Sequence, residues 1–208
     1  MVFALINFAS QIRLKDIPQL KTEIIRKALH FLIALIPSMA AINKPLTVLF
    51  LVVGTLSYSF MEYLRFYGIK VPVISSLTSI ASRPRDNGRF VMGPVTLGLG
   101  ALLALLFYPS PAAAIAIYAL AFGDGIASLA GKFFGRLRPS FLLGKSVEGS
   151  AACFIVVFFS ALAVSGHLQI ALVAAFTATA VEALPLEDYD NLIIPVTVGL
   201  AVQIASLI

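Results

Sequence analysis

The sequence has little charge and almost no cysteine. Only 12% of its 208 residues are charged and 60% are hydrophobic, whereas about 25% are charged in an average soluble domain. A soluble domain of this size could not bury so much apolar surface. Cys153 is the one cysteine, so no intrachain disulfide can form. The composition therefore excludes an ordinary soluble enzyme, a disordered chain and a disulfide-stapled secreted domain.

The apolar residues gather in stretches that are long enough, or nearly so, to cross a bilayer, which takes about 20 residues per helix. These stretches are 25–42, 46–63, 93–109, 111–131, 147–166, 168–184 and 191–208. Residues 1–12 and 71–82 are apolar on one face but too short to span, so we expect interfacial helices there. The prediction is an all-α fold, a polytopic transmembrane helix bundle of about seven spans. We expect residues 1–208 to form a single integral membrane domain.

One side of the predicted bundle is nearly free of charge. With seven spans, the N-terminal segment and the loops 63–92, 132–146 and 185–190 share the other side. The first three of these regions hold five, five and four of the 15 Lys and Arg residues, and Lys44 alone lies opposite. The positive-inside rule makes the charged side cytoplasmic. We therefore expect a multi-pass protein, in the cytoplasmic (inner) membrane if the chain is prokaryotic, with its active site at the cytoplasmic face.

An acidic residue interrupts the uncharged run 109–131. Asp124 follows Gly123, and an ionisable side chain inside a membrane costs a few kcal/mol and is a functional candidate by default. On a helix Asp124, Ser128, Gly131 and Gly135 share one face that carries no bulky side chain. Close helix packing would explain the small residues. It would not explain a carboxylate among them, so we favour a functional site.

A second motif lies at the predicted start of the span 147–166. Ser146 is a candidate N-cap with Glu148 in the first turn. A helix N-terminus beside Lys145 suits a phosphate group. The triplet Gly144-Lys145-Ser146 resembles the end of a P-loop, but Pro139 stands where the first glycine belongs and no strand precedes it. A soluble-type nucleotide-binding fold is rejected, while phosphate binding is retained.

Four acidic residues lie between positions 182 and 190: Glu182, Glu187, Asp188 and Asp190. Glu187 and Asp188 fit a solvated turn, and Asp190 or Asn191 could cap the last span. Glu182 does not fit that interpretation, because it continues an apolar stretch. Carboxylates beside phosphates usually hold a hard divalent cation.

A basic motif precedes the first apolar stretch. Arg26 and His30 are one helical turn apart, with Lys27 between them. They could bind phosphate or orient an acceptor. Equally, they could be snorkelling cations beside a packed histidine. The basic turn 83–89 leaves two similar alternatives open, a phosphate site or attraction to anionic lipid headgroups.

Together these motifs resemble the membrane lipid kinases of the dolichol kinase, phytol kinase and CTP-dependent diacylglycerol kinase group. The resemblance runs over nearly the whole chain. It is carried by Arg26-Lys27-x-x-His30, by Gly123-Asp124-Gly-x-Ala127-x-x-x-Gly131, by Gly144-Lys145-Ser146-x-Glu148-Gly149, and by Glu182 with Asp190-Asn191. It implies transfer of the γ-phosphoryl group of CTP to a membrane lipid alcohol, with Mg²⁺ as the divalent cation. The acceptor would be a polyprenol, phytol or another isoprenoid alcohol, or diacylglycerol.

Two other functions stay open. Phosphatidate cytidylyltransferases, which make CDP-lipids, look similar around Asp124-x-x-Ala127 and around Lys145-x-x-Glu148-Gly149. Their His-Gly-Gly and Asp-Arg-x-Asp patterns are missing after Gly149, which favours the kinases. A small transporter would also accommodate seven spans and an intramembrane acid. It should place polar groups along a path that reaches both faces, and the outer half of the predicted bundle has almost none.

Phosphoryl transfer needs mainly positioning and charge neutralisation, and this assigns roles to the motif residues. The expected catalytic residues are Asp124, Lys145, Glu148 and Glu182, and the expected metal ligands are Asp124, Glu148 and Asp190. The expected nucleotide- and phosphate-binding residues are Arg26, Lys27, His30, Gly123, Ser128, Gly131, Lys132, Gly144, Lys145, Ser146, Gly149 and Asn191. The expected partners are CTP, the lipid alcohol and membrane lipids, and no nucleic acid. The sequence does not determine which carboxylate is the general base, nor does it determine the oligomeric state.

Overall fold

The computed structural model describes residues 17–72, 75–76, 78, 86 and 88–207. Every regular element in these residues is a helix, and none of them forms a strand, so the all-α prediction is confirmed. The predicted interfacial helix at 1–12 lies outside the described residues, and so does most of the one at 71–82.

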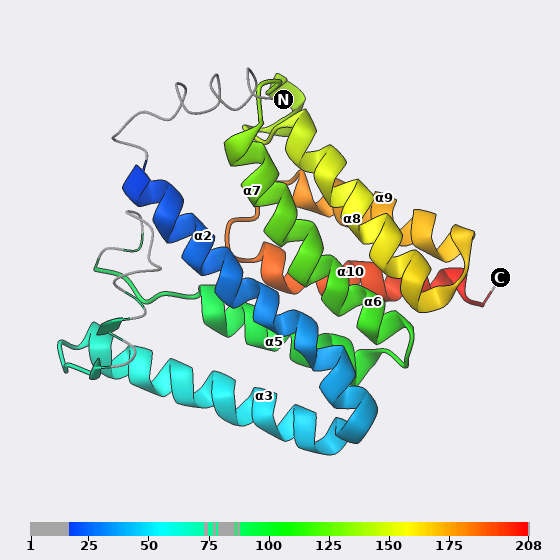
Figure 1. The fold of residues 1–208 in the computed structure, drawn as a ribbon. Coiled ribbons are helices and arrows are strands. Elements are labelled where there is room, and N and C mark those ends of the chain that lie inside the picture. Colours follow the sequence, from blue (N-terminus) through cyan, green and yellow to red (C-terminus); the bar gives the residue numbers. More distant parts are fainter. Residues whose placement is uncertain (1–16, 73–74, 77, 79–85, 87, 208) are drawn as a thin grey trace, which may run out of the picture.

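The first two apolar stretches form a helical hairpin. α2 (Ile17–Phe31) continues through the short 3₁₀ helix η1 (Leu32–Leu35) into α3 (Ile36–Phe66). The backbone leaves the helical region at Asn43, shortly before Pro45. The Asn43 side chain accepts a hydrogen bond from Leu46 N at 3.0 Å, as an N-cap does. α2 and the long part of α3 therefore run in opposite directions (Figure 1), and the boundary predicted at 42–46 lies at this kink.

The remaining helices match the predicted stretches to within a few residues. They are α5 (Gly93–Phe107), α6 (Ala112–Tyr118), the π-helical turn η3 (Ala119–Asp124), α7 (Gly125–Phe133), α8 (Val147–Ser165), α9 (Leu168–Glu182) and α10 (Asp190–Ala205). A short 3₁₀ helix, η4 (Ser140–Leu142), lies in the loop before α8. Within the described part of the chain, three helical runs are long and apolar enough to cross a membrane by length and composition: Thr22–Phe66, Ala112–Phe133 and Val147–Ser165. The count of seven spans stays a prediction, because α5, α9 and α10 are shorter.

α6 and η3 form the centre of the bundle. Ile115, Ala116, Ile117 and Leu120 are 0–1% exposed, and α5, α8, α9 and α10 pack around them. α9 meets its neighbours through small residues, the fully buried Ala171, Ala174, Ala175 and Ala178. Small side chains let helix backbones approach closely, as they do in membrane bundles. The centre thus gives η3, which ends at Asp124, a rigid support.

α2 has its charged face inward and its apolar face outward. Glu23, Lys27 and His30 are 1–4% exposed, whereas Ile24 and Leu29 are 40–45% exposed. A surface helix of a soluble protein has the opposite arrangement. An apolar outer face suits lipid. The inward charges contact η3 and α7, because Lys27 pairs with Asp124 and Glu23 pairs with Lys132. α2 therefore delivers ionisable groups to the interior of the bundle.

Candidate active site

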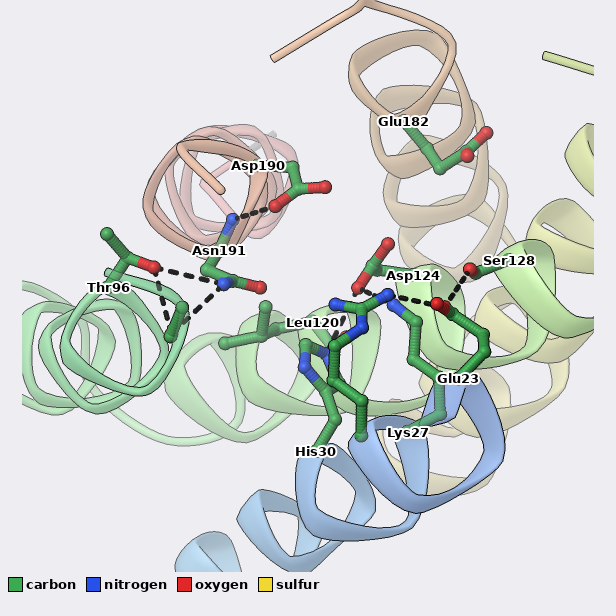
Figure 2. Close-up of polar contacts among 12 residues, drawn as sticks. Glu23, Lys27, His30, Thr96, Leu120, Asp124, Ser128, Glu182, Asp190 and Asn191 are labelled. Atoms are coloured by element: carbon green, nitrogen blue, oxygen red, sulfur yellow. Dashed lines mark hydrogen bonds and ion pairs between the residues drawn. The ribbon is translucent and has the colours of Figure 1, made fainter. Parts of the chain in front are cut away.

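Asp124 ends the π-helical turn η3, an irregularity that is frequent at functional sites. Its side chain is buried and receives a hydrogen bond from Lys27 Nζ at 2.5 Å. His30 Nε2 lies 2.9 Å from the Leu120 carbonyl oxygen and 3.3 Å from Asp124 Oδ2. Figure 2 shows Lys27 and His30 reaching Asp124 from α2. The basic motif and the intramembrane acid, 97 residues apart, are thus one cluster.

Glu23, which is not among the predicted site residues, joins this cluster. Its Oε1 accepts hydrogen bonds from Arg26 and, at 2.7 Å, from the Ser128 hydroxyl, and its Oε2 lies 2.8 Å from Lys132 Nζ. Glu23 therefore fastens α2 to α7. The signal was available, because Glu23 lies one turn before the inward-facing Lys27 on the same helical face.

The motif before α8 forms a second wall of the cavity that the Asp124 cluster also lines. Lys145 Nζ lies 2.6 Å from Glu182 Oε1, which comes from the end of α9. The other oxygen, Glu182 Oε2, is buried and has no hydrogen-bond partner among the described residues. Ser146 accepts a hydrogen bond from Gly149 N at 3.1 Å, so the predicted N-cap is confirmed. This wall offers a cation, a helix N-terminus and an unpaired carboxylate oxygen.

The glycines where α7 meets α8 serve packing as well: Gly135 follows α7, and Gly149 lies in the first turn of α8. A Cβ atom at Gly135 would lie 2.2 Å from the Gly131 carbonyl oxygen and 2.7 Å from Ser146 Oγ. A Cβ atom at Gly149 would lie 2.9 Å from the Ala127 carbonyl oxygen. The packing interpretation of the glycine stripe is therefore confirmed, because it brings α7 against α8. Asp124 and Ser128 line the same cavity, and their functional role stays a prediction.

A cavity of about 230 Å³ opens between these walls and brings most of the predicted site residues together. It is lined by Arg26, Lys27, Asp124, Ala127, Ser128, Gly131, Lys132, Arg138, Gly144, Lys145, Ser146, Gly149, Glu182, Glu187 and Asp190. Arg138 is an addition to the predicted set. It donates hydrogen bonds to the carbonyl oxygens of Gly144 and Gly131, at 2.7 and 2.9 Å, and so fixes the loop before α8.

Glu148 does not line the cavity. Its carboxylate accepts hydrogen bonds from the backbone N–H groups of Arg136 and Leu137, at 3.0 and 3.2 Å, and so holds the turn after α7. No three His, Cys, Asp or Glu side chains among the described residues gather closely enough to hold a metal ion. The predicted ligand set of Asp124, Glu148 and Asp190 therefore does not come together, because Glu148 is engaged elsewhere.

Three further predicted residues stand behind the cavity wall. Gly123 is buried, and a Cβ atom there would lie 2.9 Å from Val157 Cγ2, so it serves packing. His30 does not line the cavity, but its Nε2 lies 3.3 Å from Oδ2 of Asp124, which does. The Asn191 amide donates to Thr96 Oγ1 at 3.0 Å and to the Gly93 carbonyl oxygen at 3.3 Å, so it faces α5.

The cavity mixes charges of both signs. Arg26, Lys27, Lys132, Arg138 and Lys145 meet Asp124, Glu182, Glu187 and Asp190 at its surface. Asp190 lies ahead of the predicted span 191–208. Its burial, and next the nearby Asp124 carboxylate, raise the pKa of Asp190 to about 7. A cationic ligand between the two carboxylates would favour their ionised forms, and the surrounding cations suit an anionic one.

The motifs that resemble those of membrane lipid kinases thus meet in one cavity of an all-helical bundle. The comparisons with known proteins agree. The chain is 28% identical to phytol kinase 1, chloroplastic, of Arabidopsis thaliana over 156 residues, which cover 66% of this chain and 51% of that protein. It is 29% identical to the probable phytol kinase, chloroplastic, of Triticum aestivum over 147 residues, 62% of this chain and 49% of that protein.

A rice relative from Oryza sativa subsp. japonica, probable phytol kinase 1, chloroplastic, is 27% identical over 153 residues, 65% of this chain and 49% of that protein. The chain thus spans about half the length of the curated relatives it matches. No family model matches the chain, and no solved structure matches it significantly. The resemblance to the lipid kinase group is confirmed by these relatives.

Proposed function

We propose that this protein phosphorylates a membrane lipid alcohol, with CTP as donor, at the cytoplasmic face of the membrane. One observation carries the proposal: four motifs that are far apart in the sequence line one cavity. The names of the relatives favour phytol or a similar isoprenoid alcohol as the acceptor. The acceptor chain would stay in the bilayer while its hydroxyl group reaches the cavity.

The basic side chains would bind the phosphates of the donor. Lys145 and Lys132 lie on the cavity surface next to Arg26 and Arg138. The N-terminus of α8 adds the positive end of a 19-residue helix. Phosphoryl transfer spreads negative charge over the phosphate oxygens, and groups that are already in place stabilise this charge without reorganisation.

The acidic side chains fit a divalent cation and a proton acceptor. Mg²⁺ is usually held by one or two carboxylates together with substrate phosphates, which agrees with a cavity that lacks a three-acid cluster among the described residues. Asp124 and Asp190 would hold it, and it would neutralise charge on the phosphates. Glu182 Oε2, buried and without a partner, would accept the proton of the attacking hydroxyl.

Two independent labels test the proposal. Purified protein in lipid nanodiscs is incubated with γ-labelled CTP or ATP and with phytol, geranylgeraniol, undecaprenol, dolichol or diacylglycerol. We expect the label in an isoprenoid alcohol, with CTP preferred. Incorporation of α-labelled CTP into phosphatidate would indicate CDP-lipid synthesis instead. A folded protein that labels no lipid with either nucleotide would refute the proposed function and favour the transporter alternative.

A further inference from the structure

Asn191 and Thr96 join α10 to α5 next to the cavity. Asn191 Nδ2 donates to Thr96 Oγ1 at 3.0 Å and to the Gly93 carbonyl oxygen at 3.3 Å. The Thr96 hydroxyl in turn donates to the Gly93 carbonyl oxygen at 3.0 Å. Thr96 is 1% and Asn191 5% exposed. Buried polar side chains that satisfy one another in this way hold two helices in one relative position.

The backbones of the two helices touch at the same place. A Cβ atom at Gly100 would lie 2.0 Å from the Asn191 carbonyl oxygen and 3.1 Å from Pro195 Cγ. Only a glycine allows α10 to approach α5 so closely. The first turn of α10 is therefore fixed from two sides, by the side-chain amide of Asn191 and by its backbone.

The position of Asp190 depends on this contact between α10 and α5. It is the first residue of α10, it lines the cavity, and its Oδ1 accepts a hydrogen bond from Asn191 N at 2.8 Å. Figure 2 shows the Asp190 carboxylate extending toward the side where Asp124 and Glu182 lie, and the Asn191 amide pointing away toward Thr96. The preceding connection includes Glu187, whose backbone has a φ of 56°, so no regular element holds Asp190 from that side.

We infer that Asn191 and Thr96 are a positioning pair that holds the Asp190 carboxylate in the cavity. This revises the predicted role of Asn191, which acts through Asp190 and not on the nucleotide. The inference rests on the proposed function only in taking the ligand of Asp190 to be a divalent cation bound with the nucleotide. Partners of a metal-binding carboxylate typically change metal affinity or activity by about 10–100-fold when mutated.

The test compares three threonine variants. Thr96→Val keeps the volume but removes the oxygen that accepts from Asn191, and Thr96→Ser keeps that oxygen. Thr197→Val is the matched control, because the Thr197 hydroxyl donates to the carbonyl oxygens of Ile193 and Ile194 in its own helix, at 2.7 and 3.2 Å. Mn²⁺ binding in the presence of CTP is measured by electron paramagnetic resonance, beside thermal unfolding in detergent and the KM for the lipid.

We expect Thr96→Val to weaken Mn²⁺ binding about 10–100-fold, with the lipid KM unchanged and with Thr96→Ser and Thr197→Val close to wild type. If Thr96→Val unfolds, the double variant Thr96→Val/Asn191→Ala removes both partners and leaves fewer unpaired buried groups. It should show the same loss of binding. Unchanged Mn²⁺ affinity in a folded variant would overturn the inference.

A double-mutant cycle with Asp190→Asn separates this mechanism from a general loss of structure. In the Asp190→Asn background, Thr96→Val should have no further effect on Mn²⁺ binding. A further loss of similar size would show that the pair acts elsewhere, and wild-type protein that binds no Mn²⁺ with CTP would also refute the inference. Mn²⁺ binding that behaves as expected in a protein that phosphorylates no lipid would refute only the proposed function.

Discussion

Two buried carboxylates, Glu62 and Asp124, lie in different regions of the bundle and have different surroundings. Glu62 is 0% exposed, and its oxygens accept two hydrogen bonds from Arg65 at 2.6 Å and one from Val91 N at 2.8 Å. It does not line the cavity that Asp124 faces, and it fastens the segment before α5 to the end of α3. Asp124 is paired with Lys27 and also faces a cavity.

The comparison shows that burial of a charge does not by itself identify a functional group. Both acids have a basic partner, as buried charges must. The Asp124 region adds a cavity, several cations that line it, and the unpaired oxygen of Glu182. Asp124 should therefore control activity, while Glu62 should control stability. The following experiments test this difference.

Asp124→Asn should have the largest effect on activity. It removes the charge but keeps the shape, so we expect a loss of lipid phosphorylation on the order of 100- to 1,000-fold. Lys27 is 1% exposed and would lose its partner, so the variant should also unfold at lower temperature. Lys27→Met/Asp124→Asn should regain stability and stay inactive. An active, stable double variant would leave Asp124 with a packing role only.

Lys145→Ala should reduce activity on the order of 100-fold, because a phosphate contact made in the transition state is lost. Removal of the Lys145 side chain also leaves the buried Glu182 without its ion-pair partner, so the variant should unfold at a somewhat lower temperature. Lys44→Ala, on the opposite end of the bundle, is the control. The KM for CTP and thermal unfolding are measured together, and wild-type turnover in folded Lys145→Ala would exclude the phosphate role.

Glu62→Gln should show the reverse pattern. The amide cannot satisfy the Arg65 fork, and we expect a loss of about 1–3 kcal/mol in the free energy of unfolding. Activity below the unfolding temperature should stay close to that of wild type. The measurement is denaturant unfolding beside the phosphorylation assay. A large loss of activity at unchanged stability would show that this region also serves the site.

The smallest effect is expected from cysteines that report topology. In a Cys153→Ala background, Arg136→Cys and Tyr189→Cys should leave activity unchanged and react with a membrane-impermeant thiol reagent only from the cytoplasmic side. Lys44→Cys should react only from the opposite side. Residues 136 and 189 labelled from different sides would break the seven-span prediction and place the Lys145 loop and the Asp190 loop on different faces.

The sequence predicted most of the helices well because they are mainly apolar stretches. It missed the start of α2 at Ile17, ahead of the predicted stretch 25–42, because that part of α2 carries two charged residues. Asp124 and the Ser146 cap were also identifiable, since a charge in an apolar run and a serine before a helix are local signals. The partners of these residues were not. The direction in which Glu148 turns, and the contact of Asn191 with Thr96, depend on which helix lies alongside. Glu23 was missed because it precedes the apolar stretch 25–42, where a carboxylate is expected to be solvated, and the packing of α7 is what buries it.

The inverted face of α2 has a consequence for the assembly of the protein. Glu23, Lys27 and His30 would each be costly inside a membrane before their partners are present. Those partners come from η3 and α7, more than 80 residues further along the chain. In a chain cut before Ala112, we expect a cysteine at position 27 to stay accessible to a membrane-impermeant reagent, and to become protected once α7 is included. α2 would therefore reach its final depth in the membrane late in biosynthesis, when η3 and α7 supply the partners of its charged side chains.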